Sequence, residues 1–438
     1  MRRIFFLPVM LWLMAYVTQA QTLLSAEDCR KMALEYSDDI KIAAYQHDKA
    51  VVDQKAVQTS FFPKISGSAT YAYVFKDIDM GMNFDLSSMG VSATIPISME
   101  MSLKGAYMAG ISLQQPVFVG GKIISGNRMA KKGVEITEQN KRLTRMNTIV
   151  EVEKAYWMYV SIVEKVKLLS SYALLLDSLY QNVSNFYEQS MTTINDIQKV
   201  RTKRSNMQYE YQRAKSGLDL ARMSLCHLIG IDMSTSIVAI DTAIVIQRYG
   251  MDSVVNMGDR PEYQMLLKQV ELKELEIKNT RAGFLPTVGF SAGYTYIGGM
   301  KFAGNELDMR LPMIAANVSI PLFHFGEGAK KIKSARLAHD ISVVELNKNK
   351  ALMDIEIQQA YSAYQNTFLL IDAASESLEE ARENLKLAQD NYEMRMGTVF
   401  DVLEAQVLWQ EAYSNDIEAR TNCKIAEIEY LKVIARLE

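Results

Sequence analysis

The sequence predicts a mixed α and β membrane protein built from a duplicated unit of two strands, one very long helix and a return helix. Three observations predict this fold. The chain repeats itself, each copy has two segments with apolar residues at every second position, and the rest of each copy carries apolar residues three and four positions apart.

The repeat is visible as matching residues at a constant spacing. Pro116-Val117-Phe118 matches Pro321-Leu322-Phe323, and the same offset of 205 residues aligns Ala155-Tyr156 with Ala360-Tyr361. The register holds without a gap over 111–230. Upstream the offset becomes 223, so the first copy carries 18 extra residues between its two strand segments. One register kept over so many positions indicates a duplication.

The N-terminus has the features of a signal peptide over 1–20. Arg2 and Arg3 precede an apolar run over 4–17, and Ala20 offers a small residue at the cleavage point. Cleavage would leave Gln21 first in the mature chain, so we expect no lipidated cysteine there. The mature chain has no apolar run of 18 residues, so helices are not expected to carry it into a membrane.

Composition argues against several classes of function. The formal net charge is −3 and no long basic run occurs, which argues against a nucleic-acid partner. The histidines are scattered, and the chain has no Ser/His/Asp grouping, phosphate loop or cysteine cluster. We therefore expect no catalytic site, no cofactor, no metal site and no enzyme activity. Cys29, Cys226 and Cys423 are expected to be buried helix residues, with one bridged pair as the alternative.

Each strand segment is apolar on one face only. Over 287–296 the even positions are Val, Phe, Ala, Tyr and Tyr, whereas the odd positions are Thr, Gly or Ser. The segment 64–75 in the first copy has a similar pattern. Strands of roughly ten residues with this alternation suit a transmembrane barrel. A half-buried strand of a soluble protein shows the same pattern, so both interpretations stay open.

The remaining segments predict long coiled-coil helices. Apolar residues repeat every three or four positions from Ile357 to Tyr392, and the matching positions of the first copy run from Val152 to Tyr187. A sustained period of this kind is typical of a coiled coil. A helix over 122–190 would be roughly 100 Å long, against about 30 Å for a bilayer core. We therefore expect a stalk on the scale of the periplasm.

These patterns define the expected organisation. A signal peptide over 1–20 precedes a first copy over 21–230, an equatorial linker over 231–259 and a second copy over 260–438. The first copy is expected to contain a helix over 26–60, strands over 61–76 and 104–116, a long helix over 122–190 and a return helix over 196–229. The second is expected to contain a helix over 260–282, strands over 284–298 and 311–321, a long helix over 327–395 and a return helix over 401–437.

Four β-strands per protomer cannot close a barrel alone. An open sheet edge in lipid leaves backbone groups unpaired, and each such group costs several kcal/mol. Three protomers would supply twelve strands, an even number in the known range, whereas two would supply eight and leave no pore. Four protomers would supply sixteen, which the sequence does not exclude. The preferred prediction is a homotrimer with a shared 12-stranded barrel.

Short motifs at the breaks between helices carry a family resemblance. The run over 397–406 is Gly-Thr-Val-Phe-Asp-Val-Leu-Glu-Ala-Gln, Asp196-Ile197-Gln198 follows the other break, and Arg260-Pro261-Glu262 begins a helix. These runs, in their order inside the repeat, resemble the TolC-type outer-membrane efflux channels (outer membrane factors). The resemblance covers the whole mature sequence.

The resemblance implies a barrel continuous with a helical periplasmic tunnel, in the outer membrane of a Gram-negative bacterium. The trimer would be the passive export duct of a tripartite efflux or secretion system. Its partners would be a periplasmic adaptor (membrane fusion protein), an inner-membrane transporter and outer-membrane lipid. Asp401, Glu404 and Asp196 would line the periplasmic aperture. The adaptor would contact the two hairpin tips, which are Met191, Thr192, Thr193, Ile194, Met396, Gly397, Thr398 and Val399.

Four further points accompany these expectations. Acidic residues are also common at solvated helix starts, which would explain Asp401 and Glu404 without an aperture. The tip lacks the Thr-Arg-Thr insertion of the family, so Arg395 and Tyr392 are the candidates to replace its latch arginine. The six methionines over 80–108 suit soft Cu(I) but are better explained as flexible apolar residues. A secreted coiled-coil structural or adhesin protein is the rival class, although it does not explain the duplicated strand segments.

Overall fold

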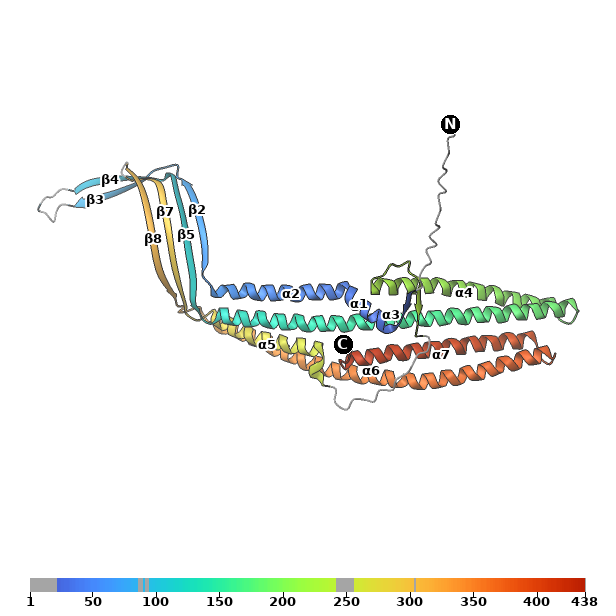
Figure 1. Cartoon of the computed structure of the whole chain (residues 1–438). Coiled ribbons are helices and arrows are strands. Elements are labelled where there is room, and N and C mark those ends of the chain that lie inside the picture. The colour runs from blue at the N-terminus through green and yellow to red at the C-terminus, as the bar shows by residue number, and fades with distance from the viewer. Residues whose placement is uncertain (1–21, 86–89, 91–93, 242–255, 303–304, 438) are drawn as a thin grey trace, which may run out of the picture. The chain divides into compact units, whose positions relative to one another are not determined.

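The computed structural model describes residues 22–85, 90, 94–241, 256–302 and 305–437 (Figure 1). The predicted signal peptide over 1–20 lies outside these residues, as do residues 242–255 of the predicted linker. The chain falls into two compact units. We call residues 45–139 and 264–348 the strand unit, and residues 1–44, 140–263 and 349–438 the tip unit. Within the described ranges, no helix combines the length and the apolar character needed to span a bilayer.

The strand unit contains a six-stranded antiparallel sheet (Figure 1). Its strands are β2 (Lys64–Tyr73), β3 (Ile78–Asp85), β4 (Thr94–Ser102), β5 (Lys104–Val119), β7 (Thr287–Phe302) and β8 (Asn305–Ser319). The four long strands lie in the order β2-β5-β7-β8. Among the described residues β2 pairs only with β5, and β8 pairs only with β7. Both outer strands of the sheet therefore have an open edge in one chain.

The β3–β4 hairpin lies between the first two predicted strands, where the sequence analysis expected no further strand. Ile78, Met80, Met82 and Phe84 alternate with polar or glycine positions, and the facing strand alternates in the same way. This period of two was overlooked because the methionines were interpreted as flexible apolar residues. The hairpin joins the rest of the sheet only where Met101 and Ser102 pair with β7.

The β7–β8 hairpin is also longer than the strands predicted over 284–298 and 311–321. The pairing register of β7 with β8 shifts between Ile297 and Met300, and Gly299 lies within this shift. Its φ of 73° is a left-handed conformation that glycine adopts readily. A Cβ at Gly299 would lie 2.3 Å from the carbonyl oxygen of Gly105. The glycine pair therefore marks a bulge inside β7 instead of the end of the strand.

The register gathers the apolar side chains on one face of the sheet. Because residues paired across antiparallel strands point to the same face, each row of partners is read directly from the pairing. One row is Ile65, Leu113, Ala292 and Ile314, and the next contains Ile111 and Tyr294. The opposite face has rows such as Ser66, Ser112 and Gly293, in which the two serine hydroxyl oxygens are 3.0 Å apart. The predicted separation of apolar and small or polar residues thus holds across β2, β5 and β7, whereas β8 places Leu311 and Met313 on the second face, opposite Thr295 and Gly293.

Four helices connect to the long strands. They are α2 (Asp38–Gln58), α3 (Lys122–Glu188), α5 (Pro261–Ala282) and α6 (Glu327–Glu393). The helix predicted over 26–60 is divided into α1 (Ala26–Tyr36) and α2 by Ser37, whose ψ of 125° is not helical. The Ser37 hydroxyl accepts a hydrogen bond from the amide of Ile40, because serine competes well for amides at a helix start.

The tip unit is a bundle of helices. The distal parts of α3 and α6 are joined there by α4 (Ile194–Ile229) and α7 (Val399–Val433). Apolar residues of all four helices form one core, with Leu176 and Val183 from α3, Val200 from α4 and Val402 from α7 almost fully buried. A short strand β1 (Thr22–Leu24) runs parallel to β6 (Ile237–Ala239) within the predicted linker.

The three cysteines are buried helix residues, as predicted. Cys29 lies in α1, Cys226 in α4 and Cys423 in α7, and all three thiols are free. Burial raises the pKa of the Cys29 thiol to about 12. The alternative of a bridged pair is therefore wrong for this structure.

Candidate functional site: the two hairpin tips

The two long helices end in the same way, 205 residues apart. Ser190 and Arg395 adopt positive φ values of 58° and 62°. Beyond them, the amide of Met191 donates to the carbonyl of Phe186, and that of Met396 donates to the carbonyl of Asn391, both at 2.8 Å. This is the Schellman ending of a helix, formed here without glycine at the left-handed position. The backbone therefore turns back identically at both tips.

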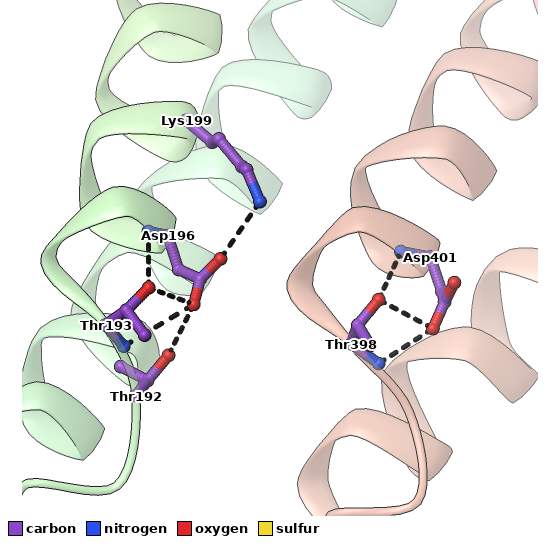
Figure 2. A network of polar contacts seen from close by, with 6 residues as sticks. All are labelled: Thr192, Thr193, Asp196, Lys199, Thr398 and Asp401. Atoms are coloured by element: carbon purple, nitrogen blue, oxygen red, sulfur yellow. Dashed lines mark hydrogen bonds and ion pairs between the residues drawn. The ribbon is translucent and has the colours of Figure 1, made fainter.

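Each return helix then begins with a capping box (Figure 2). The amide of Asp196 donates to the Thr193 hydroxyl, whose own proton goes to the Asp196 carboxylate at 2.8 Å. Thr398 and Asp401 repeat this arrangement, with the Thr398 amide donating to the carboxylate at 2.7 Å. The Thr-x-x-Asp spacing predicts such a box, and it is the signal that the sequence analysis missed.

The capping boxes hold both aspartates in the charged form. At Asp401 the hydrogen bonds from the Thr398 backbone and side chain lower the pKa below its ordinary value. At Asp196 partial burial opposes ionisation, but hydrogen bonds from Thr193, Thr192 and Lys199 outweigh it and lower the pKa. The two carboxylates form separate networks in Figure 2, and Lys199 joins only that of Asp196.

Glu404 lies on the exposed side of α7, one turn after Asp401. The structure therefore brings Asp401 and Glu404 onto neighbouring turns of one helix, while Asp196 starts α4. A groove between α4 and α7 includes Glu404 and opposes it with Lys199 and Lys203, over a floor containing Leu403. Phe400 also lines this groove and is 61% exposed. Sequence reasoning did not single out Phe400, because its exposure depends on how the two helices pack.

The predicted tip residues are mostly exposed. Met191, Ile194 and Met396 are 53%, 53% and 72% exposed, while Thr193 and Thr398 are the capping residues described above. Val399 is the exception, since it is buried in the bundle core. Thr192 and Gly397 are half-buried and line a hollow between the two tips.

Arg395 connects the two tips within one chain. Its guanidinium lies 4.3 Å from the centre of the Phe186 ring and donates to the Met191 sulfur at 2.6 Å. Tyr392 packs on the same Phe186 ring, at 5.7 Å between ring centres. Both candidates for the latch position therefore contact the first hairpin through Phe186.

The described residues hold no cluster of histidine, cysteine and acidic side chains suited to a metal ion. The site consists instead of exposed tip side chains, two capped carboxylates and an apolar groove with charged rims. Such a surface can bind another protein and impose a local negative charge.

Comparison with known proteins identifies the family of the chain. The family described as "Outer membrane efflux protein" matches residues 29–230 and 258–435. The probable outer membrane lipoprotein SilC of Salmonella typhimurium is 19% identical over 82% of this chain and 72% of its own length. The alkaline protease secretion protein AprF of Pseudomonas aeruginosa is 21% identical over 76% and 69%. The crystal structure of the Campylobacter jejuni CmeC outer membrane channel superposes with a TM-score of 0.74, at 18% identity over 94% of this chain and 86% of CmeC.

Proposed function

The chain belongs to the outer membrane efflux protein family and is an outer-membrane channel reaching into the periplasm, and we propose that three copies close its pore. In this proposal the four long strands of each copy form a twelve-stranded barrel, continued by a helical tunnel. A periplasmic adaptor grips the tips, and an inner-membrane pump supplies the energy. Family membership disfavours the rival interpretation as a secreted adhesin.

The observation that carries the proposal is a sheet with one apolar face and two open edges. Ile65, Ile111 and Ile314 on that face are 71%, 64% and 75% exposed, which a sheet surrounded by water would not tolerate over such an area. In hydrocarbon the same face is stable, but the edges of β2 and β8 then need partners. The edge strands of sister chains supply them.

Aromatic residues support the position of the membrane. On the helix side of the sheet, exposed phenylalanines occur at Phe62, Phe323 and Phe325, and tyrosines occur farther along at Tyr71 and Tyr107. From Phe62 to Tyr71 an extended chain rises about 30 Å, or about 23 Å once strands tilt by about 40°. This separation fits the apolar band of about 25 Å between the aromatic girdles of outer-membrane barrels.

The interior of the barrel favours three copies over two. Two copies would give eight long strands and a barrel filled with side chains, whereas twelve leave a pore. The β3–β4 hairpin is excluded from the count, because among the described residues it pairs with β7 at only two positions and it extends beyond the long strands (Figure 1).

At the tips we assign Asp401, Glu404 and Asp196 to the aperture and the exposed tip residues to the adaptor. The lowered pKa values of both aspartates support a charge that persists in a mildly acidic periplasm. The groove between α4 and α7 supports adaptor docking, since it joins an apolar floor to basic and acidic rims. The cargo is left open, because the pump selects it.

Purification of the mature protein in detergent tests the proposal. We expect a trimer that dissociates only on heating in denaturing gels, and that opens discrete conductances in planar bilayers. A chain that is monomeric and soluble in water without detergent would contradict it.

A further inference from the structure

An exposed arginine lies on the apolar face of the sheet. Arg310 of β8 pairs with Tyr296 of β7, which in turn pairs with Ala109 of β5. Paired residues point to the same face, and every second residue of a strand returns to it, so this row shares the face of Ile314. The Arg310 side chain is exposed. A charged side chain on a face that meets lipid is costly, and its position calls for a partner of opposite charge.

The part of the chain that the structure describes supplies no such partner. Arg310 takes part in no ion pair among these residues. Asp308, the nearest acid along β8, instead accepts a hydrogen bond from the Tyr296 hydroxyl. The strand of a sister chain that would pair with the open edge of β8 is β2, whose sequence over 64–73 contains no acidic residue. The positive charge of Arg310 is therefore available to a ligand.

Arg310 lies next to the tyrosines that mark the end of the apolar band away from the helices. The adjacent row of the sheet contains Tyr71 of β2 and Tyr107 of β5, which are 68% and 43% exposed. At this level the long arginine side chain can keep its stem among acyl chains while its guanidinium reaches the polar headgroups. The tyrosine hydroxyls beside it are further hydrogen-bond donors.

An apolar hollow begins one row inward from Arg310. Its volume is about 690 Å³, within the range of about 300–1,000 Å³ that is typical of small-ligand sites. Its lining includes Ile65, Ile111, Ala292, Tyr294, Pro312 and Ile314. Tyr294 and Pro312 form the row directly beside that of Tyr296 and Arg310. A positive charge at headgroup level and an apolar hollow on its inward side thus adjoin on one surface.

We propose that this surface binds a phosphorylated glycolipid of the lipid A type, with a phosphate at Arg310 and acyl chains in the hollow. A guanidinium matches phosphate oxygens with two parallel hydrogen bonds, which are among the strongest in proteins. The inference rests on the proposed function, which places this face of the sheet in lipid.

The level of Arg310 selects the glycolipid over a phospholipid. The helices extend into the periplasm, so the opposite end of the sheet lies in the outward-facing leaflet, where lipid A is the phosphorylated lipid. The hollow also spans four strands, or about 14 Å from β2 to β8, which leaves room for more than one acyl chain. Because β8 is an outer strand, the bound lipid would contact the edge at which a sister chain joins, and it should stabilise the trimer.

Titration of the delipidated trimer in detergent with lipid A tests the charged half of the site. The readouts are the temperature at which the trimer dissociates on denaturing gels and the lipid A retained per chain, measured by mass spectrometry. Arg310→Gln should weaken lipid A binding about ten-fold or more, as expected when a hydrogen bond to a charged group is lost. Lys64→Gln is the matched control, since it removes the same charge from an exposed position on the opposite face. It should bind lipid A like the unmodified trimer.

The apolar half is tested without changing Arg310. Ala292→Phe fills the hollow and should also weaken binding, whereas Val318→Phe enlarges an apolar side chain of the same face outside the hollow and should not. The unmodified trimer should bind dephosphorylated lipid A and phosphatidylglycerol about ten-fold more weakly than lipid A. These arms keep the proposal testable if Arg310→Gln does not assemble.

The outcomes separate this inference from the proposed function. Equal lipid A affinity of the Arg310→Gln and unmodified trimers, or of native and dephosphorylated lipid A, would overturn the phosphate site but leave the channel intact. Equal affinity for phosphatidylglycerol and lipid A would overturn the assignment to the glycolipid. An unmodified chain that forms no trimer in detergent would instead refute the proposed function.

Discussion

A positive charge on the apolar face of the sheet is expected to prevent membrane assembly, whereas the same charge one residue farther along is not. Ile111 of β5 lies between Gly67 of β2 and Tyr294 of β7, near the middle of the apolar band. Ser112 points to the opposite face, beside Ser66 and Gly293. Ile111→Lys and Ser112→Lys therefore place one ammonium group on each side of the same strand.

The expected difference is large. A lysine on the lipid face near the bilayer midplane costs about 2–4 kcal/mol, so three copies in a trimer lose about 6–12 kcal/mol. Ser112→Lys loses a hydroxyl contact with Ser66, worth about 1 kcal/mol per chain, and its ammonium group enters the water of the pore. A difference of about 2 kcal/mol per chain already exceeds a ten-fold change in the folding equilibrium.

The assay is refolding of the purified variants into lipid vesicles. The readouts are the yield of heat-modifiable trimer and the urea concentration at half unfolding. Ser112→Lys should assemble nearly as well as the unmodified chain, while Ile111→Lys should give little trimer and unfold at lower urea. Equal assembly of the two variants would refute the assignment of the apolar face to lipid.

Three further predictions follow from the tips and the helix ends. Asp401→Asn combined with Glu404→Gln should reduce the preference of the channel for cations, measured as the reversal potential in planar bilayers. Because the pKa of Asp401 is lowered below its ordinary value of 3.8, the cation preference that Asp401 supports in the unmodified channel should persist as the pH falls to 3.8 and be lost at lower pH. An unchanged reversal potential would reject the aperture. Gly230→Ala should lower the free energy of unfolding by about 2 kcal/mol or more, because φ is 75° and its Cβ would stand 2.0 Å from a tyrosine ring. Its control, Gly126→Ala, meets nothing within 4 Å in α3 and should stabilise by about 0.5–1 kcal/mol. Gln406→Leu should raise the free energy of unfolding by about 1–3 kcal/mol, since this fully buried amide has no hydrogen-bond partner among the described residues. Chemical denaturation measures the free energy of unfolding of the Gly230, Gly126 and Gln406 variants. A lower free energy of unfolding for Gln406→Leu would contradict the last of these predictions.

Much of the tip could be predicted from sequence, because its geometry is local. The Thr-x-x-Asp spacing at Thr193 and Thr398 sets both capping boxes within one turn of helix. The matched breaks 205 residues apart located the tips without any knowledge of packing. The contacts of Arg395 with Phe186 and Met191 could not be predicted, since they join residues of two hairpins that only folding brings together.

The sequence by itself determined the duplication and the face alternation of the strands, because both depend on spacing along the chain, which periodicity records directly. Its tip motifs carried the resemblance to an outer-membrane channel family, and the family comparison showed the membership. Only the tertiary structure decided that the 18-residue insertion contributes to a strand hairpin and that Ser37 divides the first helix. It also decided which outer strands are left open. Strand order and exposure arise from contacts between residues far apart in the chain, and a linear pattern does not specify which partners meet.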